Sequence, residues 1–322
     1  MTLPKKWAES ADVKPGDTVY VDQLKNGALI VLSEKVLKAA GGAKDFTINC
    51  DAITEPSLLD RLIVGSYVQG AETVKVVSQT PMNGEQIERV RTITRKLVGF
   101  DVVETSINDM LLQCSIDPTK FEIYTLFQRL STIASTMLNR VMDALMGLNA
   151  ELAREVMIRE DEAKGVYWLI TRLLTLAREF PIVADQIGLK ELIDPSLRMI
   201  AKNLRRVTYC CKNVAAIVHD LYTIRDEIDT EELAKVALLD QMVKAIFQKT
   251  VDAFFARDII IANDALNLRD TMHQEAQTRQ HVVNIPHYRA ISNMLSMIAE
   301  NSASIAAITI NLKVSESTSL PN

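Results

Sequence analysis

The chain lacks the marks of membrane-spanning, secreted and nucleotide-binding proteins. It has no run of eighteen or more uncharged apolar residues, so we predict no transmembrane helix and no membrane insertion. Its first residues, MTLPKKWAES, contain no apolar signal-peptide core, so we expect a cytoplasmic protein. No Gly-rich phosphate-binding loop and no hydrolase or zinc-protease motif occurs. We therefore predict no enzymatic activity.

Cysteine, glycine and proline are scarce. The four cysteines (Cys50, Cys114, Cys210 and Cys211) form no C-x-x-C pair, so we expect neither a disulfide framework nor a thiolate zinc site. The eleven glycines and nine prolines lie mostly before residue 120. From Pro118 onward the chain is rich in Leu, Ile, Met and Ala and nearly unbroken, which predicts long helices.

An excess of basic residues is also absent. The formal net charge is −5, which argues against a chain built mainly to coat nucleic acid. A local DNA-binding patch remains open, because net charge reports on the whole surface.

Residues 1–42 are predicted to form short strands and turns. Val19 and Val21 belong to one apolar β-forming segment, and residues 29–32 to another. Lys25-Asn26-Gly27 between them is a hairpin-turn signal, and Gly41-Gly42 is a linker. We expect Trp7 to have a core role.

Residues 43–116 alternate between strand and helix periods. The pattern predicts the order β-α-β-α-β-β, a small α+β layer with its helices on one sheet face. The predicted strands are 46–49, 73–78, 102–105 and 110–114, and the predicted helices are 56–67 and 83–98.

The remainder is predicted to be helical, and it repeats. Six helices are expected near 120–148, 149–180, 190–222, 230–256, 258–281 and 287–313, with a polar tail at 315–322. The segment beginning at Leu204 matches the one beginning at Leu295, and Asn213–Ile217 matches Ser304–Ile308. We therefore expect two copies of a three-helix unit, which bury each other's apolar stripes.

This helical pattern resembles the PhoU fold. The resembling segments are Ala153–Asp161, Leu197–Leu204 and Asn213–Ala215. In addition, Thr2–Trp7 followed by Val13–Val19 resembles the AbrB/SpoVT swapped-hairpin module, although most of the strand that usually precedes this motif is missing. Archaeal PhoU-type regulators combine both with a middle α+β segment, so the resemblance covers nearly the whole chain.

The resemblance implies a mainly α protein with five parts. These are an AbrB-like β segment (1–42), an α+β domain (43–116), two PhoU-like three-helix bundles (117–225 and 226–314) and the tail. It further implies a non-enzymatic regulator of phosphate uptake and phosphate homeostasis. The expected partners are a phosphate transporter or phosphate-signalling protein, and a second copy of the chain bound through the hairpin.

PhoU helices typically carry acidic pairs spaced i and i+4, which can hold iron, zinc or manganese. The corresponding positions here are Glu160, Lys164, Arg205 and Tyr209 in the first copy, and Arg269, His273, Ser296 and Glu300 in the second. Because most are not acidic, we expect the cluster to be absent or reduced. A reduced divalent or iron-type site would use Glu160, Asp161, Asp270, His273 and Glu300. The alternative is that residues 160–162 form a solvated helix face and His273 is a surface residue.

Two further binding sites stay open. The basic residues Lys164, Arg205, Arg206 and Arg269 would form an anion site if they converged, because arginine pairs phosphate oxygens. Lys5, Lys6, Lys14 and Lys25 match the AbrB-like motif or its turn and would contact DNA phosphates in a phosphate-responsive transcription regulator. However, residues 1–38 hold six lysines against five acids, which is a weak basic footprint.

Overall fold

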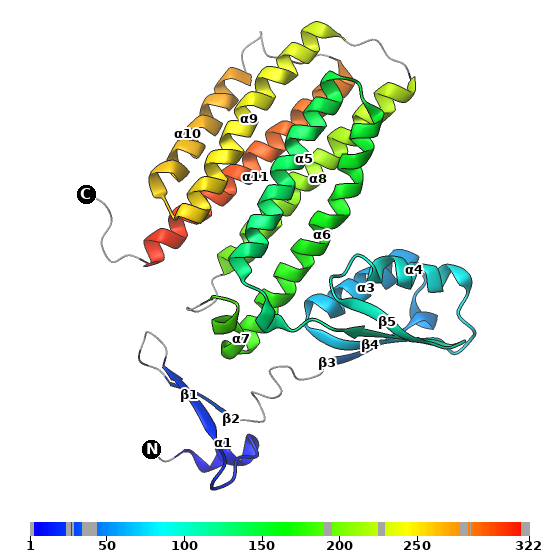
Figure 1. Cartoon of the computed structure of the whole chain (residues 1–322), viewed down its shortest axis with the longest axis vertical. Coiled ribbons are helices and arrows are strands. Elements are labelled where there is room, and N and C mark those ends of the chain that lie inside the picture. The colour runs from blue at the N-terminus through cyan, green and yellow to red at the C-terminus, as the bar shows by residue number, and fades with distance from the viewer. Residues whose placement is uncertain are drawn as a thin grey trace. The chain divides into compact units, whose positions relative to one another are not determined.

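The chain has two units, and each is built from two separate stretches of sequence (Figure 1). The computed structural model describes residues 3–23, 27, 29–33, 44–189, 195–224, 229–276, 283 and 285–316. The first unit comprises Met1–Ile123 with Arg172–Ile193, and the second comprises Tyr124–Thr171 with Asp194–Asn322. Within the described ranges, no helix is long and apolar enough to cross a membrane.

The first unit begins with a helix and a hairpin. Strands β1 (Val19–Gln23) and β2 (Leu29–Ser33) pair antiparallel in a sheet of their own, as expected. Gly27 has a φ of 83°, which suits a hairpin turn, whereas Lys25, Asn26 and Gly41-Gly42 lie outside the described residues.

Helix α1 (Lys5–Ser10) replaces the strand-and-turn structure expected at the start of the chain. Pro4 opens it, because its fixed φ suits a helix start and its carbonyl accepts from the amides of Trp7 and Ala8. No residue of α1 is buried, and Trp7 is only half-buried. The expected core role of Trp7 is therefore wrong within the single chain.

The α+β part follows the predicted order. A four-stranded sheet has the order β3-β4-β6-β5, with β3 and β4 parallel and the other neighbours antiparallel. Helices α3 and α4 lie on one face of it (Figure 1). The elements are β3 (Lys44–Asn49), η2 (Cys50–Ala52), α3 (Pro56–Val68), β4 (Ala71–Val77), α4 (Gly84–Thr94), β5 (Phe100–Thr105), β6 (Asp109–Cys114) and η3 (Pro118–Lys120).

Local chemistry sets the ends of α4. Asn83 accepts from the amide of Gln86, whose side chain accepts from the amide of Asn83 in return, so the two form a capping box. The helix ends at Thr94, earlier than predicted, and the chain then turns through Gly99 with a φ of 63°. A side chain at Gly99 would also collide with Ile116, so glycine is required there on two grounds.

The C-terminal end of a long helix belongs to the first unit. Arg172 of α6 (Ala150–Glu179) is buried, donates a hydrogen bond of 2.6 Å to the carbonyl of Tyr67, and lies over the Tyr67 ring. Glu179 forms an ion pair with Lys44. These contacts explain why residues 172–193, including α7 (Pro181–Gln186), group with the sheet, whereas the expected boundary placed them in a bundle.

The second unit contains residues 150–171 of α6 and the remaining helices (Figure 1). They are α5 (Ile123–Met146), α8 (Pro195–Ile224), α9 (Thr230–Ala256), α10 (Ile259–Ala276) and α11 (Pro286–Glu316). Helix α11 packs against α8, α9 and α10, and α10 also packs against α9. An edge-to-face contact between Phe127 and Phe254 joins the first helices of the two copies.

The packing follows the sequence repeat. Leu204 and Leu295 are both buried, as are the paired positions Ala215 and Ala306. Equivalent residues of α8 and α11 therefore face the interior in both copies, as expected for two units that bury each other's apolar stripes.

Candidate functional site: two charged clusters

The first cluster surrounds Glu160 of α6. Its side chain is only 1% exposed, so the reading of Glu160 as part of a solvated helix face is wrong. Arg205 of α8 forms an ion pair with Glu160, and Lys164 lies 2.9 Å from the same carboxylate. Lys212 of α8 is 3.8 Å away. Three cations thus surround one buried carboxylate, which offsets the cost of burying its charge.

The second cluster surrounds Glu300 of α11. Arg269 of α10 donates to both carboxylate oxygens, at 3.2 and 3.0 Å, and His273 lies 2.5 Å from one of them. Burial by itself raises the pKa of Glu300, but the hydrogen bonds from His273 and Arg269 outweigh burial and hold the pKa below its usual value.

The two clusters reverse their polarity between the copies. In the first, the acid is on α6 and the arginine on α8; in the second, the arginine is on α10 and the acid on α11. Each cluster is an ion pair between the second and third helices of its copy. Both copies thus have an ion pair between the same two helices, but the helix that carries the acid in one copy carries the arginine in the other.

These residues do not fit a multinuclear metal cluster. Glu160 and Glu300 direct their oxygens at arginine and lysine or histidine, and such cations would repel a metal ion. Asp161 contacts Lys164 at 3.5 Å, and Asp270 contacts the Nε atom of Arg269 at 2.7 Å. Over the described ranges, no three His, Cys, Asp or Glu side chains come together as metal ligands.

The expected anion site does not form as a single site. Lys164 and Arg205 meet at Glu160, whereas Arg269 belongs to the second cluster. Arg206 is exposed and takes no part in either cluster. The four basic residues therefore do not converge on one anion.

Arg206 belongs to an exposed stripe of side chains on α8, which we did not identify from the sequence. Met199, Lys202, Arg206 and Tyr209 follow the spacing i, i+3, i+7 and i+10, which places them on one helix face. Met199 is 54% exposed and Tyr209 is 49% exposed. Neither Lys202 nor Arg206 has an ion-pair partner among the residues that the structure describes. The helical spacing itself was the signal that could have revealed this α8 stripe.

The N-terminal lysines lie on the surface. Lys5, Lys6 and Lys14 are exposed, and Lys5 lies 3.9 Å from Glu9. Lys25 falls outside the described residues. Lys5 and Glu9 form a weak surface pair, which leaves Lys6 and Lys14 as the clearer cationic positions.

Comparison with known proteins gives two family matches. Residues 127–218 match the PhoU domain, and residues 1–38 match the family described as antidote-toxin recognition MazE, bacterial antitoxin. No curated protein matches the chain. A solved structure, that of PhoU from Pseudomonas aeruginosa, is similar with 17% identity and a TM-score of 0.48; the match covers 61% of this chain and 96% of that chain.

The PhoU match runs from α5 to α8 and so covers the first three-helix copy, including the Glu160 cluster and the α8 stripe. The other match covers α1, β1 and β2. The chain therefore contains a PhoU domain preceded by a MazE-type, AbrB-like segment.

Proposed function

We propose that this chain is a non-enzymatic regulator of phosphate uptake that acts through protein contacts in the cytoplasm. The observation that carries the proposal is the PhoU domain at residues 127–218. Its partner would be a phosphate transporter or a phosphate-signalling protein.

The α8 stripe supports contact with such a partner. Exposed tyrosine, methionine and arginine are the side chains that protein interfaces favour, and here they occur together on one helix face. Lys202 and Arg206 would meet acidic groups of the partner, because charge complementarity steers association. The stripe lies within the matched domain.

The test is capture of native complexes from phosphate-replete cells. We expect the full chain to recover a phosphate-transporter ATPase or a phosphate-response signalling protein, and the variant Lys202→Glu/Arg206→Glu to lose it. The matched control, Arg154→Glu/Arg159→Glu, reverses two exposed charges on α6 and should keep the partner. If neither partner class is recovered with the unaltered chain, the proposed function is wrong.

A second candidate is a phosphate-responsive transcription regulator. The match at residues 1–38 favours it, together with the exposed lysines at positions 5, 6 and 14. A DNA mobility shift that disappears in Lys5→Ala/Lys6→Ala would support this function. The absence of any shift at low salt would exclude it.

We also propose that the chain works as a homodimer joined by its hairpin. An isolated two-stranded hairpin is marginally stable in water. Here Tyr20, Val21 and Leu29 are each about half exposed on β1 and β2. A second copy would cover this apolar surface.

A further inference from the structure

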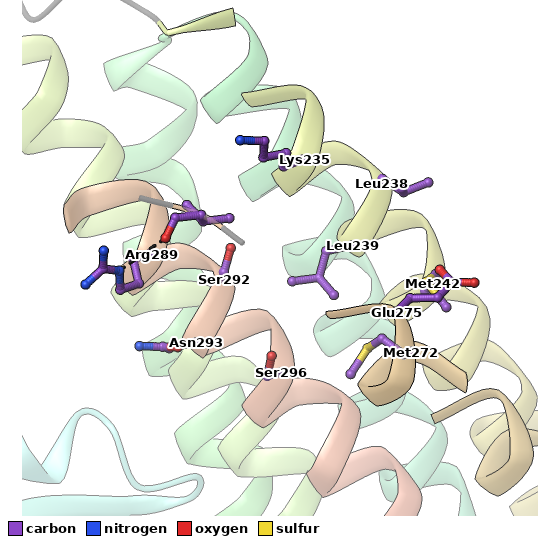
Figure 2. Close-up of a pocket in the computed structure, with 11 residues that line it drawn as sticks. Lys235, Leu238, Leu239, Met242, Met272, Glu275, Arg289, Ser292, Asn293 and Ser296 are labelled. Atoms are coloured by element: carbon purple, nitrogen blue, oxygen red, sulfur yellow. Dashed lines mark hydrogen bonds between the residues drawn. The ribbon is translucent and has the colours of Figure 1, made fainter. Parts of the chain in front are cut away.

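The second copy of the repeat contains a cavity of about 260 Å³ (Figure 2). Helices α9, α10 and α11 line it. Apolar side chains come from α9 and α10, namely Leu239, Met242 and Met272, and polar ones come from α11, namely Ser292, Asn293 and Ser296. Figure 2 shows Ser292 and Ser296 on successive turns of α11, with Leu239 and Met272 across from them. The cavity therefore has one apolar side and one hydrogen-bonding side.

The serines at the cavity differ from the other hydroxyl residues of α11. Ser302, Ser304 and Thr309 each donate to the carbonyl four residues earlier, at 2.8 to 2.9 Å. The Ser292 hydroxyl has almost no accessible surface, so a ligand in the cavity cannot reach it. Ser296 is only partly buried and makes no hydrogen bond within the described part of the chain, so its hydroxyl is the one that a ligand can meet.

The small side chain of Ser296 on α11 accounts for the space of the cavity. Ser296 occupies the place on α11 that Arg205 occupies on α8 in the first copy. In the first copy, the arginine side chain extends to Glu160. In the second, Arg269 reaches Glu300, one turn further along α11, so the space beside Ser296 is not filled by an ion pair. The copy in which the arginine lies on the second helix and the acid on the third is thus also the copy that contains the cavity.

The charged side chains at the cavity are balanced in sign. Lys235 lies 2.9 Å from Glu232 and 3.1 Å from Glu231, so its charge is already offset. Arg289 and Glu275 add one charge of each sign, and Arg289 donates to the carbonyl of Val283. A neutral ligand would enter without leaving a charge unpaired.

The volume of the cavity and the chemistry of its lining narrow the class of ligand further. The volume falls just below the range of about 300–1,000 Å³ for drug-sized ligands, so the ligand is smaller. Methionine sulfur favours aromatic rings, and Met242 and Met272 both line the cavity. The hydroxyl of Ser296 and the amide of Asn293 can both donate and accept hydrogen bonds.

We propose that this cavity binds a small uncharged ring compound with hydrogen-bonding groups along one edge, such as a free purine base. The ring lies against Leu239, Met242 and Met272, and the polar edge bonds to Asn293 and Ser296. This goes beyond the proposed function, because it makes the second copy a small-molecule sensor whatever partner the first copy binds.

The test titrates the full chain with adenine and, as a simpler ring amide, benzamide. Binding is followed by ligand-observed saturation-transfer NMR. We expect saturable binding of at least one probe, and we expect adenosine monophosphate to bind more weakly than adenine because of its charge. No binding of adenine or benzamide at millimolar concentration overturns the proposal, as does equal or tighter binding of the monophosphate.

Two variants locate the site. Ser296→Leu fills the cavity and should lower affinity at least tenfold. Ser296→Ala keeps the shape and removes one hydroxyl, so affinity should fall by about two- to tenfold, the worth of one hydrogen bond. The control is Ser304→Ala, on the exposed side of α11, which should leave binding unchanged. If Ser296→Leu does not fold, Ser296→Ala decides; unchanged affinity in the variant that folds overturns the proposal.

Discussion

Glu160 of α6 and Arg205 of α8 form an ion pair in which the carboxylate is 1% exposed and the arginine side chain is 16% exposed. The pair connects two helices of the PhoU domain at a position where the resemblance implied metal ligands. We therefore expect this contact to act on stability rather than on metal binding.

Arg205→Leu should lower the free energy of unfolding by about 1–3 kcal/mol. Loss of one partner from a buried pair typically costs more, about 3–5 kcal/mol, but Lys164 remains at 2.9 Å from Glu160. Urea denaturation measures the change. The double variant Glu160→Leu/Arg205→Leu should recover most of the loss, because the buried carboxylate is then removed and Lys164 keeps Asp161 at 3.5 Å. A double variant as unstable as the single one would contradict this explanation.

Glu300 should make stability sensitive to acid. Its pKa in the folded chain lies below the usual 4.5, so the folded state binds fewer protons than the unfolded state there. Its contribution is present above pH 4.5 and is lost as the pH falls through the lower folded pKa. The effect should stay under about 1 kcal/mol because the side chain is half exposed.

The measurement compares the native chain with Glu300→Gln in urea at several pH values. We expect the native chain to lose its advantage over the variant on going from pH 6 to pH 3. A constant difference across this range would show that Glu300 does not keep its proton-linked contacts.

Asp240 should have the opposite dependence. It is 5% exposed, and burial raises its pKa even though Lys244 lies 2.7 Å away. The folded state therefore holds the proton more tightly than the unfolded state, so stability falls as the pH rises from 3.8 through the folded pKa. Asp240→Asn should raise the free energy of unfolding at pH 7 by up to about 1 kcal/mol. A gain that is as large at pH 3 as at pH 7 would contradict the assignment.

The hairpin dimer predicts a change of mass in solution. Val21→Glu/Leu29→Glu places charges on apolar surface that the second copy would cover, so the variant should sediment as a monomer while the native chain sediments as a dimer. Ile260→Glu alters an equally apolar but more exposed residue of α10 and serves as the control. A native chain that is monomeric at micromolar concentration would rule the dimer out.

Much of the fold could be predicted because its signals are local. Alternation of Val74 and Val76, the cap at Asn83 and the turn at Gly99 each fix one element without reference to the rest of the chain. Helix α1 was missed because its six residues carry no apolar period, and only Pro4 signals its start.

The candidate site was less predictable, because it depends on which side chains meet. The sequence gives the helical spacing of Glu160 and Lys164, but the partner on α8 and the degree of burial follow from packing. The cavity likewise depends on the small side chain of Ser296 facing Met272 across two helices. Long-range complementarity of this kind has no signature within a single helix.

Because helix α6 is shared between the two units, it determines whether the units can be separated by cleavage of the chain. Its residues up to Thr171 belong to one unit and those from Arg172 to the other, and the first unit is assembled from two separate stretches of chain. No single peptide cleavage can release both units whole. A single proteolytic cut should therefore yield no fragment that contains a whole unit alone, and expression of either unit by itself would require rejoining the chain.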